Sequence, residues 1–303
     1  MSSFNHQFLY SIIIIALGYL LKRTNFIKER DGEGLSRIIF NLTLPALILV
    51  SFHDITLDTS LVLLIIIGLV YGLIMGAVGI FIFRKQEQTT KGMLTMMVPG
   101  FNIGLFAYPL VEGIWGSKGI QYFGMFDMGN AFIVFGLIYV IGAYYSDSSS
   151  SLDVRTISRQ MTQSIPFMTF IVTIFISLAS IPLPEALIET ANIISVANMP
   201  LSLLLLGIYL NFTFEKGYLK LIMQYMAVRY LIGIVAGAGL FILLPFNDMF
   251  KYTVLIGLIL PSSMSALPYA VEFNYDRRFV GTVTNMTIII SFLLMWLIAN
   301  FVI

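Results

Sequence analysis

Two stretches decide the fold: residues 99–112 read PGFNIGLFAYPLVE, and residues 261–272 read PSSMSALPYAVE. Each has two prolines and ends in Val-Glu. A proline inside a helix removes a backbone donor and clashes with the carbonyl four residues earlier, so we expect both helices to break. The structural alternative is a pair of ordinary proline kinks whose serines bond back to the backbone. The expected helix-breaking residues are Pro99, Pro109, Pro261 and Pro268.

The sequence around these stretches is too apolar for a water-soluble protein. It is 58% hydrophobic and 11% charged, with a mean hydropathy of +0.91, whereas soluble domains carry roughly a quarter charged residues. Apolar segments recur at about the 20-residue length that crosses a bilayer. We therefore predict ten transmembrane helices. Their approximate spans are 5–22, 34–52, 60–83, 91–111, 119–145, 161–181, 186–210, 218–244, 251–271 and 279–302.

The basic residues indicate an orientation. All but three of the 17 Lys and Arg residues fall in alternate loops on one side, and cytoplasmic loops carry such an excess. Lys118 and Lys251 lie on the other side, and Arg229 lies inside the eighth helix. Both termini are therefore expected outside. No basic block resembles a nucleic-acid-binding arm, so no nucleic-acid partner is expected.

One hydrophilic linker, residues 146–160, divides the predicted helices five and five. Because five is odd, two homologous halves, 1–145 and 161–303, would be inverted relative to each other, as in many secondary transporters. The chain has no cysteine, which excludes disulfides, thiolate metal sites and a cysteine nucleophile.

The two breaks predict a binding site near the middle of the membrane. In lipid, an opened backbone is tolerated only where it is buried in protein or lines a water-filled cavity. Half-helices starting near Gly104 and Ser265 would aim N-terminal amides inward, which favours anions. The expected substrate-binding residues are Asn41, Asn102, Gly104, Ser262, Ser263, Ser265 and Arg229.

Two charged residues fall deep inside predicted helices. Asp127 and Arg229 each follow a loop lysine by nine residues, which at the helical rise places each about 13 Å into the membrane. Such residues are costly and need partners. Asp127 with Asn130 is expected to hold a cation or proton that drives transport, and Arg229 to neutralise Asp127 or a substrate carboxylate. A purely structural Asp127–Arg229 ion pair is the alternative. In the last helix, Asn285 is the polar residue for which we expect a function, in ion or proton coupling.

Several motifs resemble the auxin efflux carrier family across essentially the whole chain. They are Asn41-Leu-Thr-Leu-Pro45, Asn102-Ile-Gly104 leading to Tyr108-Pro109-Leu, Phe126-Asp127-Met-Gly129-Asn130, and residues 261–272. The resemblance implies the bile-acid-sodium-symporter fold, with two inverted five-helix repeats whose fourth helices unwind and cross. Helices 1, 2, 6 and 7 would form a scaffold, and helices 3–5 and 8–10 a domain that moves against it like an elevator.

Family substrates are organic anions, such as auxin in plants and malate-like carboxylates in bacterial relatives. The short central loop resembles bacterial members. The sequence departs from the family pattern at Ser262, Ser263, Met264 and Ser265.

The predicted function is secondary transport of small organic anions across the plasma (inner) membrane, with no cofactor beyond coupling to Na⁺ or H⁺. A sodium-coupled bile-acid-like symporter and a cation/proton antiporter are the alternatives, followed by a membrane receptor. The sequence gives no support for an enzyme. It has no membrane-embedded His, no HExxH motif and no paired catalytic carboxylates. Any homodimer is expected to form through lipid-facing helix surfaces.

Overall fold

The computed structural model describes residues 3–146, 154–211 and 216–302, and every regular element in these ranges is helical. Residues 147–153 of the predicted linker lie outside the described residues. The first half contains α1 (Ser3–Arg23), α2 (Asp31–Ile38), η1 (Ile39–Thr43), α3 (Leu44–Phe52), α4 (Thr59–Ile82), α5 (Gln88–Met97), η2 (Ile103–Ala107), α6 (Tyr108–Phe132), η3 (Ile133–Leu137) and α7 (Ile138–Tyr145). The second half contains α8 (Val154–Gln163), α9 (Ile165–Leu178), α10 (Glu185–Ser195), α11 (Asn198–Tyr209), η4 (Lys216–Tyr218), α12 (Leu219–Leu243), α13 (Asp248–Gly257), α14 (Ala266–Glu272) and α15 (Arg277–Phe301).

Seven helices in the described ranges are long and apolar enough to cross a membrane. They are Phe4–Arg23, Asp31–Phe52, Thr59–Ile82, Ile103–Tyr145, Glu185–Tyr209, Leu219–Leu243 and Arg277–Phe301. An eighth span results if Arg155–Gln163 and Ile165–Leu178, bent by 72°, cross together. Large apolar side chains on their outer faces, such as Ile193 and Ile242, are more than three-quarters exposed and suit contact with lipid tails. The chain is therefore a multi-pass membrane protein.

Besides this bent pair, which falls in the predicted sixth segment, two local features lower the count from the predicted ten to seven. The 43-residue helix Ile103–Tyr145 contains the end of the predicted fourth segment and all of the fifth, joined at Gly116. Gly116 has φ +58° and ψ −146°, a backbone conformation that would be strained in a residue with a side chain. The helix is kinked at this residue. The predicted ninth segment forms two short helices, α13 and α14, and neither could cross a membrane alone.

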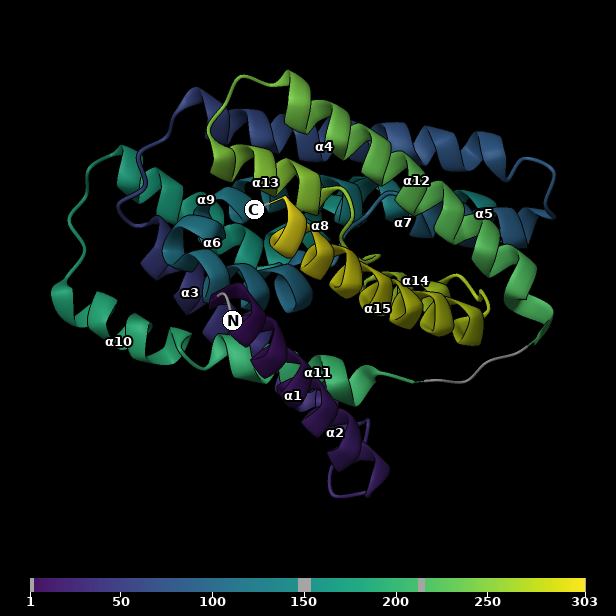
Figure 1. The fold of residues 1–303 in the computed structure, drawn as a ribbon, viewed down its shortest axis with the longest axis horizontal. Helices are drawn as coiled ribbons and strands as arrows, with labels where there is room; N and C mark the ends of the chain where they lie inside the picture. The colour runs from purple at the N-terminus through teal and green to yellow at the C-terminus, as the bar shows by residue number, and fades with distance from the viewer. Residues whose placement is uncertain (1–2, 147–153, 212–215, 303) are drawn as a thin grey trace.

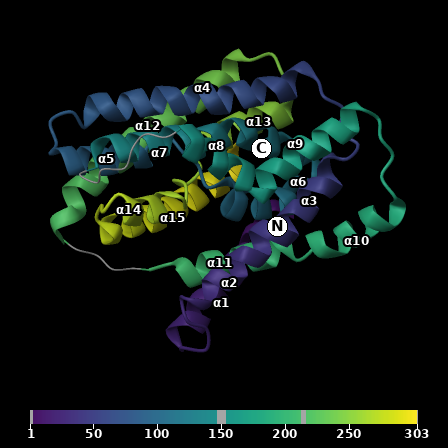
Figure 2. The ribbon, with the colours of Figure 1, turned by 180° about the vertical axis from the view of Figure 1, so that it is seen from behind.

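The helices form two groups (Figure 1). α1, α2, α10 and α11 lie together in the lower part of the view, and α4, α5, α7 and α12–α15 lie above them. Seen from behind, α4 lies along one edge and α1 with α2 at the opposite edge (Figure 2). α1 packs most closely on α11, and α4 packs on α6, although the members of the first pair are far apart in the sequence. α1, at the start of the chain, therefore lies beside α11, which comes from its second half.

Two segments interrupt the helices at the places where the sequence has Pro99 and Pro261. α5 ends at Met97 and η2 begins at Ile103, while α13 ends at Gly257 and α14 begins at Ala266. The intervening residues 98–102 and 258–265 are not helical. Pro109 lies in the first turn of α6, where the helix continues from η2, and Pro268 lies in the first turn of α14. The helix therefore does not break at Pro109, because the wider π-helical turn η2 precedes it and adapts the backbone.

Candidate functional site

The two unwound segments cross and pair through their backbones. Phe101 and Ser262 form an isolated antiparallel bridge. The Asn102 amide donates to the Pro261 carbonyl at 2.9 Å, and the Ser263 amide donates to the Gly100 carbonyl at 3.2 Å. An unpaired backbone group buried in a membrane costs several kcal/mol. This bridge satisfies part of the backbone that unwinding exposes.

Arg229, on α12, donates to three backbone carbonyls at the crossing. Its Nη1 donates to Val98 O at 2.6 Å, and its Nη2 donates to Gly100 O and Leu260 O, both at 2.9 Å. Its guanidinium also lies 4.7 Å from the centre of the Phe101 ring. The side chain is fully buried. One turn earlier, the Tyr225 hydroxyl donates to Met97 O at 2.9 Å. A cation from one helix therefore holds both unwound segments.

Asp127 and Asn130 form a connected network that reaches the backbone of Phe101. The Asp127 carboxylate accepts from the Tyr108 hydroxyl at 2.8 Å and from Asn130 Nδ2 at 3.0 Å. Asn130 also pairs with the backbone of Phe101, accepting from its amide at 3.0 Å and donating to its carbonyl at 3.2 Å. The network links the carboxylate of Asp127 directly to the crossing.

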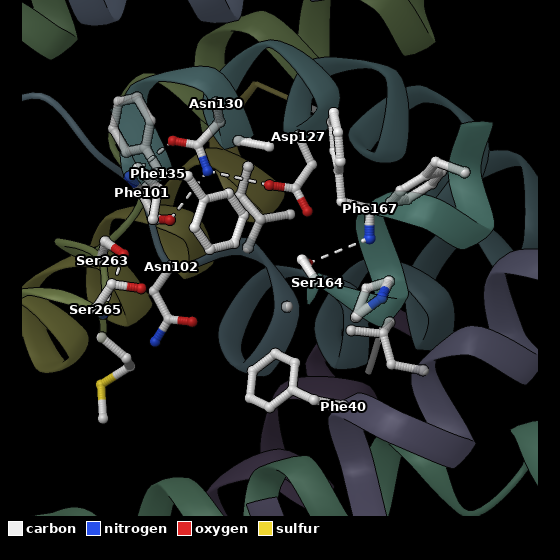
Figure 3. Close-up of a pocket in the computed structure, with 18 residues that line it drawn as sticks. Phe40, Phe101, Asn102, Asp127, Asn130, Phe135, Ser164, Phe167, Ser263 and Ser265 are labelled. Carbon is white, nitrogen blue, oxygen red and sulfur yellow. Dashed lines mark hydrogen bonds between the residues drawn. The ribbon is translucent and has the colours of Figure 1, made fainter. Parts of the chain in front are cut away.

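A cavity of about 150 Å³ opens beside this network (Figure 3). It is smaller than the roughly 300–1,000 Å³ of pockets for drug-sized ligands, so it suits a small solute. Its wall combines a few polar groups with many aromatic rings. The lining residues are Phe40, Leu44, Phe101, Asn102, Ile103, Gly104, Asp127, Asn130, Ala131, Val134, Phe135, Ser164, Pro166, Phe167, Phe170, Ser263, Met264 and Ser265.

Asn102 is the polar side chain best placed to bind a ligand. Its Oδ1 accepts from the Leu105 amide at 3.3 Å and caps the helix that begins at Ile103. Its Nδ2 has no hydrogen-bond partner, although the residue is only 5% exposed. Figure 3 shows Asn102 beside Ser263 and Ser265, with Ser164 across the cavity. A buried donor without a partner, next to a helix N-terminus, suits an anionic ligand.

Six of the predicted site residues line this one cavity: Asn102, Gly104, Asp127, Asn130, Ser263 and Ser265. The other four lie elsewhere. Asn41 is exposed on η1, and Ser262 is buried against Thr287, 3.0 Å away between hydroxyl oxygens. Asn285 donates to the Asn211 carbonyl at 3.1 Å.

Arg229 occupies a position that differs from both predictions made for it. No ion pair between described residues includes Arg229 or Asp127, and Arg229 is absent from the cavity lining. Backbone carbonyls take the guanidinium, because the unwound segments expose more acceptors than their own amides satisfy.

Sequence reasoning missed several residues of the site. Tyr108 was treated only as part of a family motif, yet its buried hydroxyl holds Asp127. Ser164 precedes Ile-Pro166 and caps α9, a serine-then-proline pattern that predicts a helix start. The five rings of Phe40, Phe101, Phe135, Phe167 and Phe170 carry no local signal that separates them from lipid-facing phenylalanines.

Comparison with known proteins agrees with this architecture. The family model described as membrane transport protein matches residues 4–299. An uncharacterized transporter of Methanothermobacter thermautotrophicus is 28% identical over 92% of this chain and 92% of its own length. An uncharacterized transporter of Methanocaldococcus jannaschii is 21% identical over 95% of this chain and 97% of its own length. The chain thus belongs to the membrane transport protein family, the auxin efflux carrier type of transporter that its motifs resemble.

Proposed function

We propose that this membrane transporter is a secondary transporter of small organic anions, such as malate or auxin-like acids, in the plasma membrane. The observation that carries the proposal is the unpartnered Nδ2 of Asn102, which lines the cavity at the start of the helix that begins at Ile103. A carboxylate there would receive the Asn102 donor and the positive end of a helix dipole. The hydroxyls of Ser263 and Ser265 line the same wall.

The transport movement we propose is of the elevator type, within a ten-helix arrangement of two inverted repeats that has both termini outside. The two interrupted segments, 98–102 and 258–265, support the repeat, since each follows a ten-residue helix, α5 or α13, at a corresponding place in its half. The cavity supports the movement, because its wall comes both from segments expected in the scaffold and from segments expected in the moving domain. Phe40 and Leu44 with α9 form one side, and Asn102, Asp127 and Ser263 form the other.

The test is counterflow of labelled malate and related carboxylates in proteoliposomes, with and without sodium or a pH gradient. We expect exchange in the natural protein and a loss of at least about tenfold in Asn102→Asp, which corresponds to roughly 1.4 kcal/mol of lost affinity. Aspartate keeps the helix cap but replaces the free donor with a negative charge. Asn25→Asp makes the same change at an exposed position between the spans Phe4–Arg23 and Asp31–Phe52 and should leave exchange unchanged. Absence of flux for every carboxylate tried would overturn the proposal.

A cation/proton antiporter is the second candidate, because Asp127 is the one charged residue among those that line the cavity. The cavity wall offers a carboxylate and no basic side chain, which suits a cation better than a dianion. The discriminating observation is collapse of an imposed pH gradient on addition of Na⁺ or K⁺ salts without any organic anion. Such a collapse, lost in Asp127→Asn, would favour this candidate over anion transport.

A further inference from the structure

The groups around Asp127 limit what its carboxylate can hold. Both of its oxygens face hydrogen-bond donors, the Tyr108 hydroxyl and the Asn130 amide. Hard cations are held by several oxygen ligands. Here Asn130 Oδ1 accepts from the Phe101 amide, the Phe101 carbonyl accepts from Asn130, and no cluster of three acidic, histidine or cysteine residues exists in the described ranges.

We propose that Asp127 is a proton site, that the coupling ion is this proton, and that Asn130 transmits its arrival to the crossing of the two unwound segments. The assignment of a coupling role rests on the proposed transport function. The proton site itself rests only on the network of Tyr108, Asp127 and Asn130.

The elements packed around Asp127 place few charged groups near its carboxylate. α3, α4, α9 and α11, which pack on α6 or line the cavity, carry no Asp, Glu, Lys, Arg or His. α1 and α13 carry theirs near their ends, at His6, Lys22, Arg23, Asp248 and Lys251. The Arg229 guanidinium donates to the Val98, Gly100 and Leu260 carbonyls, and Glu112 and Lys118 lie further along α6. Tyr108 is the one titratable group in contact with the carboxylate among the described residues.

Protonation would change two things in the site at once. The hydrogen bond from Asn130 to the carboxylate is charge-assisted and weakens when the charge is lost. Because the same Nδ2 also donates to Phe101 O, the change reaches the residue that pairs with Ser262. The negative charge facing the cavity also disappears, and with it the repulsion of an anion bound near Asn102. Proton and anion would therefore bind with positive coupling.

The proton site can be tested without any substrate, by infrared difference spectroscopy of the purified protein in lipid nanodiscs across a pH series. We expect carboxylic-acid C=O absorption that grows as the pH falls and contains one component, the Asp127 band, that is lost in Asp127→Asn. Glu112→Gln is the matched control, because Glu112 is the other membrane-embedded carboxyl of α6 and its Oε2 has no partner. That variant should keep the Asp127 band. Replacing KCl with NaCl should leave the band and its midpoint unchanged.

Tyr108→Phe gives a second readout if Asp127→Asn fails to fold. This variant keeps the carboxyl but removes a donor to its charged form, so the midpoint of the band should move to higher pH. A band that survives in Asp127→Asn, an unmoved midpoint in Tyr108→Phe, or loss of the band in sodium would each overturn the proton site.

Transport measurements separate this inference from the proposed function. Above the midpoint, the anion concentration that half-saturates counterflow should rise by about tenfold per pH unit, since one proton must bind with the anion. A titrating Asp127 band with no flux of any carboxylate would leave the proton site standing and refute anion transport. Anion flux whose half-saturating concentration does not change with pH would support anion transport and refute the coupling role of Asp127.

Discussion

At the scale of single residues, the guanidinium of Arg229 supplies the hydrogen bonds that the ends of α5 and α13 lack. The last carbonyls of a helix have no partners within it, and they carry the negative end of the helix dipole. Arg229 bonds to three carbonyls that follow these two helix ends: Val98, Gly100 and Leu260. A buried cation is tolerated here because two dipole ends meet it, and it needs no carboxylate.

Arg229→Met is therefore expected to destabilise the protein by about 2 kcal/mol or more, since Val98 O and Leu260 O lose this donor and each buried acceptor left unsatisfied costs roughly 1–3 kcal/mol. The measurement is thermal unfolding in detergent, followed by the fluorescence of the two tryptophans. Arg229→Lys keeps the charge but loses the paired donors of the guanidinium, so its stability should lie between those of the natural protein and Arg229→Met.

The same experiment distinguishes this arrangement from an ion pair. The coupling between Arg229→Met and Asp127→Asn in the double variant should stay below about 1 kcal/mol, because the two residues share no direct contact and meet only through Asn130 and Phe101. A coupling of several kcal/mol would show that Arg229 neutralises Asp127 and that the carbonyl contacts are secondary.

At the scale of elements, two prolines are accommodated in the same way. The π-helical turn η1 (Ile39–Thr43) ends two residues before Pro45, and η2 (Ile103–Ala107) ends two residues before Pro109. Proline clashes with the carbonyl four residues earlier, and a widened turn relieves the clash while the helix continues. Thr43 at the end of η1 donates to Asn198 Oδ1 at 3.1 Å, which ties this turn to α11.

These elements show what the sequence could predict and what it could not. Lengths of apolar runs predict membrane helices, and two prolines in matching stretches predict the interruptions at 98–102 and 258–265. Nothing in the run around Pro109 distinguishes a break from a π-helical turn, because that depends on how the turn packs. The partners of Arg229 were equally unpredictable, since they are carbonyls that become available only after both segments unwind.

A side-chain cap outside the membrane gives a pH-dependent prediction. Asp58 caps α4 by accepting from the Leu61 amide at 2.9 Å and the Ser60 hydroxyl at 2.6 Å, and these bonds lower the pKa of its carboxyl. Asp58→Ala should cost about 1 kcal/mol at neutral pH. Because the folded-state pKa is depressed, the contribution is complete above the ordinary value of about 3.9 and is lost as the pH falls through the folded pKa.

The difference in melting temperature between the natural protein and Asp58→Ala should therefore shrink as the pH falls below about 4. Asp54→Ala is the control, because Asp54 is an exposed neighbour 3.9 Å from the His53 ring, and such pairs contribute little. A melting-temperature difference for Asp58→Ala that stays constant down to acid pH would contradict the assignment of the cap.

At the scale of the whole molecule, glycines bring helix backbones into contact between α1 and α11 and between α4 and α6. A Cβ placed on Gly207 of α11 would lie 2.0 Å from Ile15 O, and one on Gly18 of α1 would lie 2.2 Å from Leu204 O. A Cβ on Gly129 of α6 would lie 2.1 Å from Ile65 O of α4. Small residues allow this approach in membranes, where close packing drives helix association. The cavity wall, by contrast, is filled by large rings.

An elevator movement requires this difference between close backbone packing and a wall of side chains. Each of the two bodies must stay rigid through close packing of its own helices, and the surfaces where the bodies meet must be able to slide. Gly207→Ala should then lower stability by about 1–3 kcal/mol, as overpacking does, because backbone atoms of α1 cannot move aside alone. Gly239→Ala on α12 is the matched control, since a Cβ there meets nothing within 4 Å and alanine favours the helix by up to about 1 kcal/mol. Thermal unfolding of both variants measures the difference. If Gly207→Ala were as stable as Gly239→Ala, α1 and α11 would be free to separate, and a sliding movement of one rigid group against another would lose its support.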